Sequence, residues 1–163
     1  MPQFPESYLG GGILALRDWL GVARMSGLEI FVGEWTVEVG FPGAPPARSV
    51  FEWILDGTYL AQRTEVPLPE VPDSLSLVGP AQDGGYTQHY FDSRGVARLY
   101  TMTFDGARWT LLRETADFTP LHFAQRFTGV FSADGDRIDG AWEKQEPGGD
   151  WELDFELVYT RAG

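Results

Sequence analysis

The stretch that decides the fold is YTQHYFDSRGVARLYTMTFDGARWTLLR, residues 86–113. It contains three runs of alternating side chains, separated by turns at residues 93–95 and 105–106 that each include a glycine. Alternation with a period of two is typical of β-strands, and glycine supplies the positive φ that tight hairpin turns require. The stretch therefore predicts three consecutive antiparallel strands.

The two turns also determine which side chains share a face of the sheet. A three-residue loop at 93–95 sets Tyr90 opposite Arg98. A two-residue turn at 105–106 then sets Arg98 opposite Arg113. We expect this face, which is the more apolar one, to be the interior; its members are Tyr86, Gln88, Tyr90, Arg98, Tyr100, Met102, Phe104, Trp109, Leu111 and Arg113.

The same pattern continues on both sides of this stretch. It predicts ten strands, at residues 34–41, 49–55, 58–66, 74–79, 86–92, 96–104, 108–115, 124–132, 137–144 and 151–160. Ten strands joined by hairpins, without a long crossover, favour an all-β fold: an antiparallel up-and-down barrel of the lipocalin-like kind, which leaves no sheet edge exposed. We assign residues 28–163 to this single domain and residues 1–27 to an N-terminal helical or irregular extension.

Two further strand pairs give specific expectations. A turn at residues 134–135 sets Phe127 opposite Trp142 on an apolar face and Arg126 opposite Glu143 on the other. In the last strand, strict alternation predicts one inward-facing set, composed of Trp151, Leu153, Phe155, Leu157 and Tyr159. The acidic residues between them are expected to face water.

Composition restricts the partners and the compartment. A net charge of -12 repels phosphate backbones, so we expect no nucleic-acid partner. The apolar stretch 13–22 is interrupted by Arg17 and Asp18 and is too short to span a bilayer, so we expect neither membrane insertion nor a signal peptide. The absence of cysteine suits a reducing compartment, and we expect the cytoplasm. The oligomeric state stays open, with a homodimer among the alternatives.

Several short motifs carry a resemblance to known barrels. Gly33-Glu34-Trp35 resembles the Gly-x-Trp opening of lipocalin-like proteins, and the further motifs are YTQHYFDSRG at 86–95, QRFTG at 125–129, FSADG at 131–135, GAWEK at 140–144 and FELVYTR at 155–161. Together they resemble the bacterial family called domain of unknown function 1579, and more distantly the calycin superfamily of lipocalins, fatty-acid-binding proteins and nitrobindins. The resemblance implies a barrel whose end is closed by Arg161 packing over Trp35.

The expected interior suggests a binding site for a small hydrophobic or amphipathic molecule. Its candidate ligand-binding residues are Tyr86, Gln88, Tyr90, Arg98, Tyr100, Met102, Trp109 and Arg113. Buried arginines need a counter-charge, which could be Asp92, a glutamate from another strand, or the carboxylate or phosphate of an anionic ligand. Alternatively, both arginines reach water at the barrel mouth, and the tyrosines only fill the barrel.

Two other functions remain as alternatives. A cofactor-free enzyme of isomerase or cyclase type could use tyrosine, arginine and aspartate in the interior, where burial perturbs pKa values; its catalytic residues cannot be named from the sequence, because no known catalytic motif is present. The resemblance to nitrobindins implies a third function, haem binding through a histidine. His122 is the candidate, since His89 falls on the outward face. For the leading function we expect no cofactor and no metal.

Overall fold

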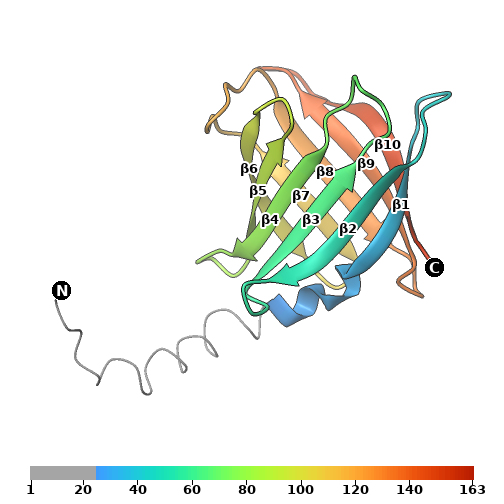
Figure 1. Ribbon diagram of the computed structural model, residues 1–163. Helices are drawn as coiled ribbons and strands as arrows, with labels where there is room; N and C mark the ends of the chain where they lie inside the picture. The colour runs from blue at the N-terminus through green and yellow to red at the C-terminus, as the bar shows by residue number, and fades with distance from the viewer. Residues whose placement is uncertain (1–24) are drawn as a thin grey trace, which may run out of the picture.

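The computed structural model describes residues 25–163, which form a closed barrel of ten antiparallel strands preceded by a short 3-10 helix (Figure 1). The elements are η3 (Ser26–Phe31), β1 (Gly33–Val39), β2 (Ala47–Ile54), β3 (Tyr59–Glu65), β4 (Ser74–Pro80), β5 (Tyr86–Asp92), β6 (Ala97–Phe104), β7 (Arg108–Arg113), β8 (Ala124–Phe131), β9 (Arg137–Gln145) and β10 (Trp151–Arg161). Each strand pairs with its neighbours in sequence, and β10 closes the barrel against β1. The predicted all-β up-and-down barrel is confirmed.

The start of the described chain belongs to the barrel core. Met25 is 1% exposed and packs within the hydrophobic cluster, together with Leu28 and Phe31 of η3. Residues 25–27, assigned to the extension from sequence, therefore contribute to the folded domain. The remainder of that extension lies outside the described residues. Within residues 25–163 no helix has the length and apolar character needed to cross a membrane.

An aromatic cluster seals the end of the barrel beneath which η3 lies (Figure 1). The ring of Phe31 is at its centre, with centroid distances of 4.9–5.4 Å to four rings, those of Phe51, Phe104, Trp109 and Phe131. Tilted and edge-to-face pairs of this kind contribute about 0.5–1.5 kcal/mol each beyond the burial of their area. The cluster fills the lower half of the barrel interior, so only the opposite half is left to hold a cavity.

Arg161 and Trp35 hold the helix against this end. Trp35 Nε1 donates a hydrogen bond of 2.8 Å to the carbonyl of Phe31, and the Arg161 guanidinium lies 4.2 Å from the centre of the indole ring. The same guanidinium donates to three backbone carbonyls and one carboxylate, at Ile30, Val32, Gly135 and Asp136. The cation–π closure implied by the resemblance is confirmed. Through Arg161, the last strand β10 is linked to η3 and to the start of β1.

The register of the β5–β6 hairpin is as predicted, but that of β6–β7 is not. Tyr90 lies opposite Arg98, whereas Phe104 lies opposite Trp109, two residues further along than a turn at 105–106 would give. The turn forms one residue later because the Asp105 carboxylate accepts hydrogen bonds from two backbone N–H groups that follow it. A shift of two keeps the same side chains inside the barrel, but the expected placement of Arg98 opposite Arg113 is wrong.

The last two hairpins give one confirmation and one correction. Phe127 lies opposite Trp142, and Arg126 opposite Glu143, as predicted. In β10, however, a β-bulge between Leu153 and Phe155 changes which face the side chains point to. Leu153 is consequently 60% exposed. Because a bulge inserts one extra residue, strict alternation cannot continue through it.

Trp151 precedes the same bulge and lies outside the barrel, which corrects its expected inward placement. Its ring packs 4.3 Å beneath the guanidinium of Arg126, and Arg126 forms an ion pair with Glu143 on the outer face. Only the part of β10 that follows the bulge alternates as predicted, with Leu157 and Tyr159 buried.

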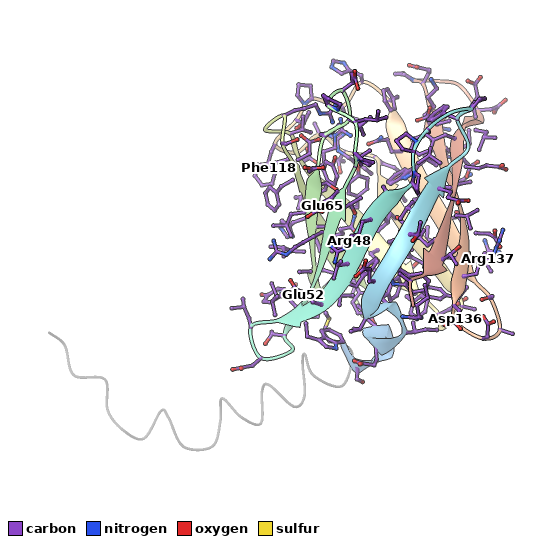
Figure 2. The ribbon with its side chains drawn as sticks, turned by 45° about the vertical axis from the view of Figure 1, so that its right-hand side comes forward. Arg48, Glu52, Glu65, Phe118, Asp136 and Arg137 are labelled. Atoms are coloured by element: carbon purple, nitrogen blue, oxygen red, sulfur yellow. The ribbon has the colours of Figure 1, made fainter. Side chains whose placement is uncertain are left out.

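We predict that Arg161→Ala lowers the free energy of unfolding by about 2 kcal/mol or more, because it leaves three partly buried backbone carbonyls without their charged donor. The matched control is Arg137→Ala, which removes a neighbouring arginine whose exposed ion pair with Asp139 contributes little (Figure 2). Urea unfolding followed by tryptophan fluorescence measures both. Equal losses in the two variants would contradict the role assigned to Arg161.

Candidate functional site

A cavity of about 230 Å³ occupies the half of the barrel away from η3. The loops that follow β1, β3, β5, β7 and β9 lie at the barrel end opposite η3 (Figure 1), and the cavity reaches this end through Val39, Val66 and Ser74. Phe118 projects from one of these loops into solvent, with 71% of its surface exposed (Figure 2). The lining residues come from nine of the ten strands and one adjoining loop: Val37, Val39, Ala47, Gln62, Thr64, Val66, Ser74, Ser76, Gln88, Tyr90, Trp109, Leu111, Phe127, Trp142, Phe155, Leu157 and Tyr159.

The cavity has two chemically different walls. Strands β3, β4 and β5 supply the polar wall, which consists of Gln62, Thr64, Ser74, Ser76, Gln88 and Tyr90. Strands β7 to β10 and β1 supply the apolar wall, which consists of Val37, Val39, Trp109, Leu111, Phe127, Trp142, Phe155 and Leu157. The lining contains no aspartate, glutamate, lysine or arginine. The cavity is thus amphipathic but uncharged.

Part of the polar wall is held by internal hydrogen bonds. Gln62 Nε2 donates to Ser49 Oγ over 3.0 Å, and the hydroxyls of Ser49 and Thr64 are 3.0 Å apart. Burial raises the pKa of Tyr159 to about 12, although a hydrogen bond with Gln62 opposes that rise. These contacts fix the orientation of the Gln62 amide, so this part of the wall is ordered without a ligand.

Two polar atoms in the lining have no such partner. Gln88 Oε1 and Trp109 Nε1 are buried and without a hydrogen bond among the described residues, and their side chains belong to residues only 4% and 2% exposed. A buried polar atom left unpaired costs about 1–3 kcal/mol. Both side chains line the cavity, although the two unpaired atoms themselves are buried behind its surface.

Next to the mouth, Arg113 is neutralised from within the protein. Its guanidinium donates to both carboxylate oxygens of Asp117 at 2.9 Å and to the carbonyl of Thr119 at 2.7 Å. The two side chains are 3% and 6% exposed. The Arg113 guanidinium and backbone N–H groups of Leu99 and Thr119 hold the pKa of Asp117 below its usual range, even though burial raises it. The counter-charge for Arg113 is thus Asp117, which was not among the residues considered from sequence.

Arg98 and Tyr100 complete this polar cluster. The Tyr100 hydroxyl donates to Gln125 Oε1 over 3.1 Å, and Arg98 Nη1 reaches the same oxygen at 3.5 Å. Burial raises the pKa of Tyr100, while Arg98 lowers it. Arg98 Nε is buried without a hydrogen-bond partner among the described residues. The cluster adjoins the cavity but does not line it.

A second carboxylate near the mouth is also engaged. Asp92 Oδ2 accepts hydrogen bonds from Tyr90 at 2.9 Å and Arg94 at 2.7 Å. Burial by itself raises the pKa of Asp92, but the hydrogen bonds from Arg94, Tyr90 and two backbone N–H groups lower it to about 2. Burial and the bond to Asp92 raise the pKa of Tyr90. Both groups therefore keep one protonation state near neutral pH.

The sequence-predicted site residues divide into three groups. Gln88, Tyr90 and Trp109 line the cavity. Tyr86 and Met102 are buried in the hydrophobic core and do not reach the lining. The remaining three form the cluster beside the mouth: Arg98, Tyr100 and Arg113.

The two histidines lie outside the cavity. His122, in the loop between β7 and β8, is exposed, and His89 is exposed on β5. Neither belongs to the lining, so the cavity offers no histidine to a haem iron. The donor set does not fit haem. Among residues 25–163, no three aspartate, glutamate or histidine side chains gather as metal ligands.

Sequence reasoning missed most of the polar wall, although the signal was present. A two-residue turn at Asp56-Gly57 implies that Phe51 lies opposite Gln62 and Ser49 opposite Thr64, which is the observed pairing. Applying the turn argument to this hairpin would have placed Gln62 and Thr64 on the inner face. The unpaired atoms of Gln88 and Trp109 carry no sequence signal, because they depend on neighbours from distant strands.

Comparison with known proteins identifies the architecture. The sequence matches no protein-family model and no curated protein. The structure is similar to the crystal structure of Rv2717c from M. tuberculosis, with a TM-score of 0.56 and 14% sequence identity, over 88% of this chain and 99% of that one. At this identity the similarity shows a shared fold alone.

We predict that Asp117→Asn destabilises the protein by about 3–5 kcal/mol, because it leaves the Arg113 guanidinium buried without a counter-charge. Adding Arg113→Met to this variant should recover most of the loss. Asp139→Asn, in an exposed pair with Arg137, is the control and should cost less than about 1 kcal/mol. Urea unfolding at neutral pH measures all of these, and an additive double variant would contradict the prediction.

We also predict a contribution of Asp92 to acid stability. Because its folded-state pKa of about 2 lies below the usual 3.8, its contribution is present above pH 4 and is lost as the pH falls towards 2. We expect about 1 kcal/mol, because Arg94, which pairs with the buried Asp92 carboxylate, is 55% exposed and water screens its interaction. The free energy of unfolding, measured from pH 6 to pH 2, should fall less steeply in Asp92→Asn. Parallel profiles would refute the assignment.

Proposed function

We propose that this protein binds a small amphipathic molecule in its interior. The observation that carries the proposal is a cavity closed at one end by the η3 aromatic cluster, open at the other, and lined by side chains two of which carry unpaired polar atoms. A core built only for stability would fill such a space, since unfilled volume and unpaired polar atoms both cost free energy. Retention of both features is expected where a ligand completes the interior.

The size of the cavity limits the occupant. About 230 Å³ lies below the range of roughly 300–1,000 Å³ that is common for pockets holding drug-sized ligands. We therefore propose a compact molecule that fits wholly inside the barrel, below the mouth loops. Exposed aromatic side chains at the mouth, including Phe118 and Phe41, would contact such a molecule as it enters.

We further propose kinship with the lipocalin-like barrels of the calycin superfamily, and with the family called domain of unknown function 1579. The support is the closed antiparallel barrel together with the closure of Trp35 by Arg161. The bacterial origin and cytoplasmic location expected from sequence belong to the same proposal.

An enzymatic role has less support from the cavity lining. The titratable side chains in the lining are the tyrosines Tyr90 and Tyr159, and burial raises the pKa of each. Efficient proton transfer needs a group whose pKa lies near the working pH. Binding without turnover is therefore the function we favour.

Native mass spectrometry of the purified protein, compared with its denatured mass, tests the proposal. We expect an additional mass that disappears on denaturation. In Val39→Trp the indole should obstruct the mouth and abolish this mass, because Val39 lines the cavity. Val130→Trp makes the same substitution at an exposed position of the outer face and should keep it. Retention of the mass in Val39→Trp would place the ligand elsewhere.

A further inference from the structure

The two unpaired atoms and the two walls of the cavity restrict the charge and the polarity of a ligand that would fit it. We infer that the cavity binds an uncharged, facially amphipathic molecule, with an apolar ring system and a hydroxyl or amide group along one edge. This inference rests on the proposed function, because it specifies the chemistry of the same cavity. It replaces the anionic ligand that two facing arginines had suggested.

The absence of charge in the lining is the first step. An ionised group moved from water into this cavity would lose its hydration and find no counter-charge among the lining residues. The charge of Arg113 beside the cavity is already balanced by Asp117, and its Nε and Nη2 donate to Asp117 and Thr119. A carboxylate or phosphate is therefore disfavoured, whereas a neutral polar group is not.

The unpaired atoms give the second step. Gln88 lines the cavity, but its Oε1 is buried and reaches a ligand only when the side chain turns. Because Oε1 accepts hydrogen bonds only, the ligand group that pairs with it must be an O–H or N–H group. Trp109 Nε1 donates hydrogen bonds only, so the ligand group that pairs with it must be an acceptor. A hydroxyl or a carboxamide supplies both functions and carries no charge.

The arrangement of the walls gives the third step. The polar wall formed by β3–β5 and the apolar wall formed by β7–β10 and β1 are separate sectors of the same barrel. Phe127 and Trp142 on the apolar wall have ring centroids 5.3 Å apart and present aromatic surface to the cavity. A molecule with one polar edge and one apolar face matches both sectors at once, unlike a chain that is polar only at its tip.

Three naphthalene derivatives with one ring system test this inference: 2-naphthol, 2-methoxynaphthalene and 2-naphthoate. At pH 7 the first is a neutral donor, the second has no donor, and the third is an anion. We expect 2-naphthol to bind about tenfold or more tightly than 2-methoxynaphthalene, because only the hydroxyl satisfies Gln88. We expect 2-naphthoate to bind most weakly. Quenching of protein tryptophan fluorescence and isothermal titration calorimetry report the affinities.

The substitution Gln88→Leu links the preference to its residue. It should remove the difference between 2-naphthol and 2-methoxynaphthalene while leaving the melting temperature equal or higher, because it deletes an unpaired buried acceptor. Gln145→Leu, outside the cavity lining, is the matched control and should keep the preference. If Gln88→Leu does not fold, Gln88→Met replaces it.

The possible failures are distinguishable. Equal affinities for the three compounds, or tightest binding of 2-naphthoate, would overturn the inferred ligand chemistry while leaving binding in the cavity intact. If none of the three binds and the protein is also empty by native mass spectrometry, the proposed function itself fails. If Gln88→Leu still prefers 2-naphthol to 2-methoxynaphthalene, the hydroxyl binds to a group other than Gln88, and the role inferred for Gln88 is wrong.

Discussion

The closure of one barrel end by η3 is the constraint on which the rest of the structure depends. Phe31 fills the lower interior with its ring, and Trp35 and Arg161 fix the backbone on either side of it. Arg161 comes from the last strand and Trp35 from the first, so the same contacts also secure the β1–β10 seam. With that end filled, the unfilled volume is confined to the opposite half of the barrel, where loops rather than a helix control access.

Charge and polarity are kept apart in this opposite half. Two arginines beside the mouth are neutralised within the protein, in the pairs Arg113–Asp117 and Arg94–Asp92. The cavity itself is polar only through amides and hydroxyls. This separation is physically favourable, because a neutral polar group loses far less hydration free energy on burial than an ion does. For the ligand binding that we propose, it favours discrimination by hydrogen-bond complementarity over attraction of opposite charge.

Unpaired polar atoms in a folded core are a cost that selection for stability alone would remove. Gln88 and Trp109 line the cavity and each carry one such atom, whereas Gln62, two strands from Gln88, donates a hydrogen bond to Ser49. Gln62 and Gln88 both belong to the polar wall, so one part of that wall is preformed and another part is not. In the function that we propose, a ligand completes the second part, and stability and binding oppose each other at Gln88.

The sequence by itself determined the ten strands, their up-and-down order and the inward face of residues 86–113, because alternation and glycine turns are local properties of the chain. It could not determine the β6–β7 register, which depends on hydrogen bonds to the Asp105 side chain, or the bulge in β10, which breaks the alternation. Only the tertiary structure decided the site. Asp117 is only four residues after Arg113, but the loop after β7 places its carboxylate there together with the backbone N–H of Leu99 in β6. Whether Gln88 finds a partner depends on residues of other strands, and no local pattern encodes those distances.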